Sequence, residues 1–154
     1  MFEDLRDLYQ EVILDHGRRP RHGEKLACFD AEARGNNPLC GDRIDLTVKY
    51  GPQGEIAKAG FAARGCAISI AAADLMAETI AGLSVTAAET LSQAFQTLAR
   101  TGVPPALDPP LAERLARLAP LAGVHEFPSR VKCATLPWHA LRAALAGNKE
   151  ASSE

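Results

Sequence analysis

The sequence has 154 residues, of which 47% are hydrophobic and 23% charged, an ordinary composition for a globular protein that can form one hydrophobic core. Seventeen basic and nineteen acidic residues leave a net charge of −2, which disfavours nucleic acid or an anionic membrane as a partner. With no secretory leader and no apolar run of membrane-spanning length, we expect a cytoplasmic protein. Its four cysteines are then more consistent with metal binding or catalysis than with disulfides.

Hydrophobic periodicity predicts a helix followed by strands in the first half of the chain. Apolar residues recur at steps of three and four before Gly17, as on the buried face of a helix. Strict alternation later in this half indicates a half-buried strand, and the turn at 51–54 sends the chain back as another strand. The predicted elements are a helix at 2–16 and strands at 26–34, 44–50 and 55–64.

The second half is predicted to be helical, interrupted by a proline-rich connector at 101–110. The last helix would begin after Thr135 as N-cap, with Pro137 in its first turn. The predicted helices are 68–80, 87–100, 111–118 and 136–146. This order predicts a two-layer α+β fold, with a three-stranded antiparallel sheet covered by helices on one face. We expect a single domain at 1–147 and a flexible polar tail at 148–154.

A turn-rich segment, 35–42, places Cys40 and Asp42 two residues apart. Side chains at i and i+2 of an extended chain lie on the same side, and Gly41 between them lets the backbone turn tightly. Cys66 and Cys133 each precede a predicted helix in a polar context. Together, Cys40, Asp42, Cys66 and Cys133 would form a complete tetrahedral shell of three sulfurs and one oxygen for zinc.

Taken one at a time, the cysteines are weak evidence for a site, because a free cysteine is often buried as inert packing. Cys28 lies in the apolar stretch 26–29, and we assign it to strand packing. Asp42 is also a common turn residue. No pair of cysteines forms a CxxC motif, which disfavours a thioredoxin-type redox couple or a zinc ribbon. The four histidines, His16, His22, His125 and His139, are not adjacent to the cysteines.

Three motifs resemble those of the U-type iron–sulfur assembly proteins, the IscU/SufU family. They are Asn37-Pro38-Leu39-Cys40-Gly41-Asp42, Gly65-Cys66-Ala67-Ile68-Ser69 and Lys132-Cys133-Ala134-Thr135-Leu136-Pro137-Trp138. The opening segment 8–16 and Arg19-Pro20-Arg21 are similar too. The long connector at 101–124 and the lysine at 132, where IscU carries a histidine, resemble the SufU branch.

The resemblance implies a SufE/NifU-like fold and a role in iron–sulfur cluster assembly. A SufU-type protein is a zinc-dependent sulfurtransferase that accepts persulfide sulfur from a SufS-type cysteine desulfurase and passes it to a downstream Suf assembly scaffold. It would activate the desulfurase rather than act as a stand-alone enzyme. By the same resemblance, zinc would be held by Cys40, Asp42, Cys66 and Cys133, with Cys40 as the catalytic acceptor thiolate and Arg130 as a partner contact.

Two other functions are compatible with the same residues. One is a scaffold on which a transient [2Fe–2S] cluster is built, because an oxygen ligand would make the cluster labile enough to transfer. The other is a structural zinc-binding interaction domain, although structural zinc sites are usually built from cysteine and histidine alone.

Overall fold

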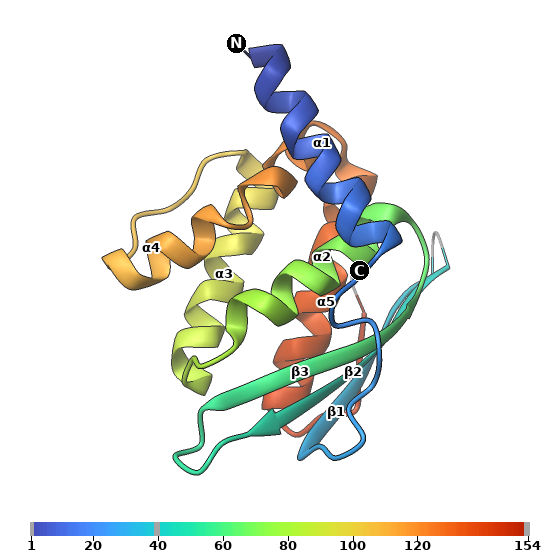
Figure 1. Ribbon diagram of the computed structural model, residues 1–154, viewed down its shortest axis with the longest axis vertical. Helices are drawn as coiled ribbons and strands as arrows, with labels where there is room; N and C mark the ends of the chain where they lie inside the picture. The colour runs from blue at the N-terminus through green and yellow to red at the C-terminus, as the bar shows by residue number, and fades with distance from the viewer. Residues whose placement is uncertain (1, 39–40, 153–154) are drawn as a thin grey trace.

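The structure is a computed structural model that describes residues 2–38 and 41–152. A sheet forms one layer, and α2, α3 and α5 lie together on one of its faces (Figure 1). This confirms the predicted α+β class with helices on one face. In chain order the elements are α1 (Phe2–Arg18), β1 (Ala31–Asn37), β2 (Asp42–Tyr50), β3 (Ile56–Arg64), α2 (Ala67–Ile80), α3 (Val85–Thr101), α4 (Pro109–Ala116), the 3-10 helix η1 (Ala119–Glu126), α5 (Pro128–Leu145) and β4 (Glu150–Ser152).

The sheet has four strands in the order β3-β2-β1-β4, so the prediction of three antiparallel strands is wrong. The pairs β1–β2 and β2–β3 are antiparallel, whereas β4 runs parallel to β1. The fourth strand comes from the segment expected to be a flexible tail. Helix α5 packs on β1 and delivers the chain to the edge of that strand, where the Arg34 N–H donates to the Lys149 carbonyl at 2.8 Å. An open strand edge offers unpaired backbone groups, which this short segment satisfies although its own sequence has no strand pattern.

The first strand begins later than predicted, at residue 31 rather than 26. The preceding apolar stretch lies in a loop that crosses the sheet, where the Leu26 N–H donates to the Thr47 hydroxyl at 3.0 Å. This loop covers part of the outer face, and Thr47 is consequently buried there. Cys28 belongs to the loop and is exposed. The assignment of Cys28 to the packing of a strand is therefore wrong.

The last helix begins eight residues earlier than predicted, at Pro128, so Cys133 lies inside α5 rather than before it. Pro137 is interior to the helix and provides no N–H for the carbonyl four residues earlier, which belongs to Cys133. Thr135 is not an N-cap, and its hydroxyl donates to the Val131 carbonyl at 2.9 Å. Because a proline inside a helix is costly, the sequence favoured a helix that begins next to Pro137. In the structure the core buries most of the helix, and this burial outweighs the cost of the interior proline.

The hydrophobic core lies between the sheet and the helices. Phe61 of β3, Phe95 of α3 and Trp138 of α5 are among its largest fully buried side chains. The Trp138 ring is stacked on Phe95 with centroids 5.3 Å apart. Within the described part of the chain, no helix is long and apolar enough to cross a membrane.

Helix α1 is fixed on α2 by a fully buried carboxylate, Asp74. The His16 imidazole Nδ1 lies 2.5 Å from one Asp74 oxygen, and the His22 N–H donates to the other at 2.8 Å. At Gly17 the two helices approach so closely that a Cβ would lie 3.0 Å from the Ala67 carbonyl oxygen. The C-terminal end of α1 therefore rests on the first turn of α2.

Candidate metal centre

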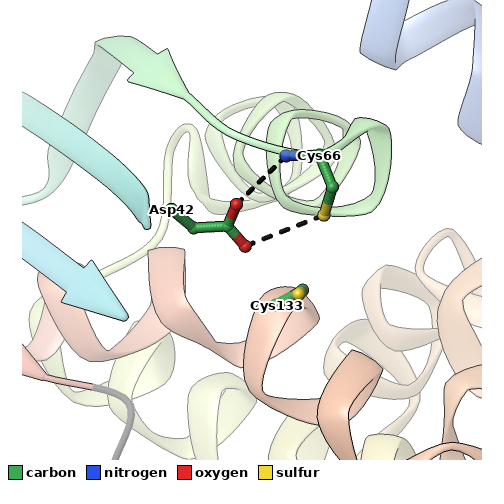
Figure 2. Close-up of side chains that lie close together, drawn as sticks. All are labelled: Asp42, Cys66 and Cys133. Atoms are coloured by element: carbon green, nitrogen blue, oxygen red, sulfur yellow. Dashed lines mark hydrogen bonds between the residues drawn. The ribbon is translucent and has the colours of Figure 1, made fainter. Parts of the chain in front are cut away.

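The ends of β2 and β3 bring Asp42 and Cys66 together. Asp42 opens β2, and the pairing of Arg43 with Arg64 places the last residue of β3 beside it. The next residues of the chain are Gly65 and Cys66, and Cys66 is the N-cap of α2. The Cys66 N–H donates to Asp42 Oδ1 at 3.1 Å, and the Cys66 thiol lies 3.7 Å from Asp42 Oδ2 (Figure 2).

Gly65 is required by the position of the Asp42 carboxylate. A Cβ at position 65 would lie only 2.2 Å from Asp42 Oδ1, and Gly65 has a φ of 152°, which L-residues rarely adopt. A glycine is thus needed both for the backbone turn and for the space that the carboxylate occupies. The Gly-Cys dipeptide is the local sequence signal for this arrangement.

Cys133 reaches the same point from α5. Its side chain is buried, and its thiol lies 3.5 Å from the Ser129 carbonyl one turn earlier. Figure 2 shows the Cys133 sulfur on the α5 surface that faces the Asp42 carboxylate and the Cys66 sulfur. Because α5 packs on α2 and on β1 and β2, tertiary packing rather than sequence proximity delivers this third group.

One ligand atom each from Asp42, Cys66 and Cys133 lies within 4.8 Å of the others, so the three residues could hold a metal ion. Two adjacent ligands of a tetrahedral zinc, one sulfur and one oxygen, would be about 3.6 Å apart. The observed Cys66 Sγ to Asp42 Oδ2 distance of 3.7 Å fits that spacing. Two sulfurs and one carboxylate oxygen are also donors that zinc accepts.

The electrostatics of the metal-free site disfavour a negative charge on Cys133. Burial raises the pKa of the Cys133 thiol above its ordinary value, and the neighbouring Asp42 and Cys66 raise it further. A bound divalent cation would reverse this effect, because a coordinating thiol is deprotonated. A cation bound here and the Cys133 thiolate would therefore stabilise each other.

The fourth predicted ligand, Cys40, lies outside the described residues. The strand ends on either side of it are described: Asn37 pairs with Asp42, and the Gly41 N–H donates to the Asn37 carbonyl at 2.9 Å. Position 40 therefore belongs to the connection between β1 and β2, two residues from the Asp42 carboxylate. Among the described residues, histidines do not join the group: His16 pairs with Asp74, and the His125 ring contacts the Ala122 carbonyl.

The model of the NifU-like N-terminal domain matches residues 8–134, which include every position of this centre. The chain belongs to this family. In this NifU-like N-terminal domain, an aspartate and two cysteines from two strand ends and a distant helix lie around one point.

Relatives with known names align over nearly the whole chain. The iron–sulfur cluster assembly scaffold protein IscU of Streptococcus pyogenes serotype M1 is 38% identical over 141 residues, covering 92% of this chain and 84% of the relative. The zinc-dependent sulfurtransferase SufU of Bacillus subtilis strain 168 is 37% identical over 145 residues, covering 93% and 92%. A solved structure from Fervidobacterium islandicum AW-1, described as a SUF-system scaffold, has a TM-score of 0.77 at 28% identity and covers 88% of this chain and 94% of its own.

Arg130 lies three residues before Cys133, in the first turns of α5, and is exposed. It borders a depression of about 420 Å³ whose other lining residues are mostly apolar. They are Ile13, Ile68, Pro120, Gly123, Val124 and Phe127. Phe127 is unusual for a large apolar side chain because 58% of it is exposed. In this NifU-like domain the face beside Cys133 thus combines a cation with exposed apolar surface, which is compatible with contact to another protein.

One buried polar group was not predicted from the sequence: Asp74, which connects α2 to α1. A signal was present, because a single carboxylate interrupts the otherwise apolar stretch 70–77 of α2. A buried carboxylate requires hydrogen-bond donors, so its partners had to come from another element. Which element supplies them, α1 and the loop after it, depends on tertiary packing alone.

Proposed function

We propose that this protein is a zinc-dependent sulfur acceptor in iron–sulfur cluster assembly. It would take persulfide sulfur from a SufS-type cysteine desulfurase and pass it to a downstream Suf scaffold. The observation that carries the proposal is the convergence of Asp42, Cys66 and Cys133 on one point. The 37% identity to a protein named zinc-dependent sulfurtransferase supports zinc as the metal.

Zinc would be held by Asp42, Cys66 and Cys133 together with Cys40. When bound, zinc supplies a charge that keeps its thiol ligands deprotonated. The Asp42 carboxylate is held by the Cys66 N–H and is almost fully buried, so it contributes a fixed oxygen donor. The shell would combine two fixed thiols, one fixed carboxylate and Cys40.

Cys66 and Cys133 are poorly placed to leave their positions. Cys66 caps α2, where its sulfur accepts the Ser69 N–H at 3.4 Å, and Cys133 is buried inside α5. Moving either would disturb a helix packed in the core. Cys40, by contrast, belongs to a glycine- and asparagine-rich stretch of the sequence between two strands, which we expect to change conformation at small cost. We therefore assign the acceptor role to Cys40.

The transfer step is a thiol exchange. The Cys40 thiolate attacks the outer sulfur of the desulfurase persulfide, a new sulfur–sulfur bond forms on Cys40, and the desulfurase cysteine leaves as a thiolate. No external oxidant or reductant is consumed. Arg130, exposed beside Cys133, would contact the desulfurase during this step.

A second candidate is a scaffold for a transient [2Fe–2S] cluster on the same four residues. The 38% identity to a protein named IscU favours it, as does the carboxylate in the donor set. The two functions differ in an easily observed property. A colourless protein with one equivalent of zinc indicates the sulfur acceptor, whereas a brown protein with visible absorption indicates the scaffold.

The decisive experiment combines the zinc-loaded protein with its cognate desulfurase and free cysteine, with and without a chelator. We expect desulfurase activation that the chelator abolishes, and an extra sulfur on the peptide containing Cys40 in non-reducing mass spectrometry. An extra sulfur appearing first on Cys66 or Cys133 would contradict the role of Cys40. Absence of any activation would leave a structural zinc domain.

Asp42→Ala tests the predicted shell separately from transfer. We expect weaker zinc binding in competition with a chelator and an unchanged fold, because three thiols and the core remain. Full zinc occupancy under competition would show that Asp42 is not a ligand. Asp45→Ala is a suitable control, because Asp45 lies on the same strand but pairs with Arg34 and Arg43 on the outer face.

A further inference from the structure

Two arginines stand directly opposite each other at the end of the sheet nearest the metal centre. Arg43 of β2 pairs with Arg64 of β3 in the antiparallel register, so their side chains share one face of the sheet. Both are exposed, on the face opposite the core. Like charges directly opposite each other destabilise a sheet, so this pair works against stability.

One carboxylate lies nearby, and it is shared. Asp45 Oδ1 lies 2.9 Å from Arg34 Nε, whereas Asp45 Oδ2 lies 3.6 Å from an Arg43 nitrogen. Among the described residues, Arg64 forms no ion pair within 4.0 Å. Two guanidinium groups, those of Arg34 and Arg43, thus share the Asp45 carboxylate, and the positive charge is least compensated at Arg64.

Two neighbouring depressions lined by residues of this sheet differ in their charge. The one of about 210 Å³ beside β4 is lined by three cationic side chains and three anionic ones. The one of about 270 Å³ is lined by Arg43 and Arg64, with Asp45 as its anionic residue and Ala62 and Ala63 between them. Small alanines leave the guanidinium groups accessible. Only the second depression therefore favours an anionic occupant.

The cationic depression lies at the same end of the two strands as the proposed acceptor site, although Arg43 and Asp42 project from opposite faces of the sheet. Arg43 directly follows Asp42, and Arg64 lies two residues before Cys66. A protein that delivers sulfur to Cys40 must approach this end of the sheet. Nucleic acid is disfavoured, because its affinity rests on many phosphate contacts, whereas this depression offers two arginines on a chain with a net charge of −2.

We propose that Arg43 and Arg64 bind an acidic surface segment of the cysteine desulfurase, and that this contact orients the desulfurase over the metal centre. The proposal rests on the proposed function, since the partner is the desulfurase. The repulsion between the two arginines is then relieved when partner carboxylates enter the depression. Such charge complementarity at an interface mainly affects the association rate and the choice of partner.

The test is the variant Arg64→Gln, with Lys58→Gln as its matched control. Lys58 is also exposed on the outer face of β3, opposite a like charge, Lys49, but lies toward the far end of the strand. Both changes remove one positive charge and relieve one like-charge pair. Desulfurase affinity is measured by titration calorimetry at low (about 30 mM) and high (about 500 mM) ionic strength.

We expect Arg64→Gln to weaken desulfurase binding roughly two- to fivefold at low ionic strength and to reduce its salt dependence, while Lys58→Gln changes neither. Arg64→Lys, which keeps the charge, should retain most of the affinity. Thermal unfolding of Arg64→Gln should show equal or higher stability than the wild type. Weaker binding by a variant that is no less stable is not expected of a merely structural residue.

Equal binding by Arg64→Gln and Lys58→Gln, with a wild type that does activate the desulfurase, would overturn this inference and leave the proposed function intact. A wild type that neither binds nor activates the desulfurase would instead overturn the proposed function. Single-stranded DNA bound by the wild type and lost in Arg64→Gln, with desulfurase affinity unchanged, would assign the arginines to nucleic acid and also overturn the inference.

Discussion

The two ends of helix α2 are stabilised by different means. At the N-terminal end the cap is Cys66, whose sulfur accepts the Ser69 N–H at a distance of 3.4 Å. At the C-terminal end the guanidinium group of Arg114, from α4, donates to the carbonyls of Thr79 and Ala81 at 2.5 and 2.8 Å. A thiol is a weak acceptor, whereas hydrogen bonds from a charged donor are strong.

The difference indicates what each end contributes. A serine or aspartate would cap the N-terminus of α2 better than a cysteine does, so the cysteine is explained by chemistry rather than by helix stability. The arginine satisfies carbonyls that a helix end leaves without partners, and it lies at the opposite end of α2 from the metal centre. We therefore expect substitutions at the N-terminal end of α2 to change metal binding and substitutions at its C-terminal end to change stability.

The largest effect is expected for Cys66→Ser. Loss of this ligand should lower zinc affinity by more than about a hundredfold, the upper range already reached by changes to outer-shell partners. The metal-free variant should unfold with the same or a higher free energy, by up to about 1 kcal/mol, because serine is a good N-cap. Chelator competition and denaturant unfolding measure the two quantities.

Ser84→Ala is the control for that experiment. Ser84 caps α3 through the Ala87 N–H at 3.1 Å, so its loss should cost about 1 kcal/mol of stability without changing zinc affinity. If metal-free Cys66→Ser were instead destabilised by more than Ser84→Ala, Cys66 would itself stabilise α2. That result would contradict the conclusion that the cysteine cap serves chemistry rather than helix stability.

Arg114→Met should have the opposite effect: it should lower stability and leave metal binding unchanged. Removal of two hydrogen bonds from a charged donor to carbonyls at a helix end should lower the free energy of unfolding by about 2 kcal/mol. Zinc affinity should not change. Arg117→Met is the matched control on the next turn, because Arg117 is exposed, and it should change stability by less than about 0.5 kcal/mol. Equal stabilities of the two variants would contradict the role of Arg114.

In the metal-free protein, the ionisation of Cys133 should make the free energy of unfolding depend on pH. Burial raises the pKa of this thiol in the folded state above its ordinary value of 9.0. The unfolded chain therefore loses this proton first as the pH rises, and stability is full below about pH 9 and falls above it. The slope contributed by one such group is about 1.4 kcal/mol per pH unit.

Urea unfolding between pH 7 and 10, with the metal removed, measures that slope. Cys133→Ser provides the reference, because a serine hydroxyl does not ionise in this range. The difference in slope between the two proteins should appear only above about pH 9. Parallel stability curves over the whole range would show that Cys133 ionises as readily in the folded protein as in the unfolded chain.

The smallest effect is expected for Cys28→Ser. Cys28 is exposed, and its sulfur lies 3.7 Å from the Lys49 ammonium group on the outer face of the sheet. The change should alter stability by less than about 0.5 kcal/mol and leave desulfurase activation unchanged. A folded variant that lost activation would show that this cysteine takes part in sulfur transfer.

The sequence alone determined those elements whose pattern is local. Alternation located the core-facing side chains of β2, and hydrophobic periodicity located α2 and α3 to within a few residues. The position of Cys66 before α2 was likewise predictable, because Gly65 and the start of a helical pattern adjoin it. Local periodicity survives in the fold wherever one face of an element is buried along its whole length.

Tertiary structure decided the features that depend on what an element packs against. The apolar residues 26–29 form a loop over the sheet rather than a strand, and residues 150–152 form a strand because α5 delivers them to an open edge. Helix α5 continues through Pro137, which local propensity forbids but burial in the core outweighs. For the same reason Cys133 reaches Asp42 and Cys66 from inside a helix. The chemistry of the three side chains was predictable from the sequence, but only the packing of α5 on α2 and the sheet brings them together.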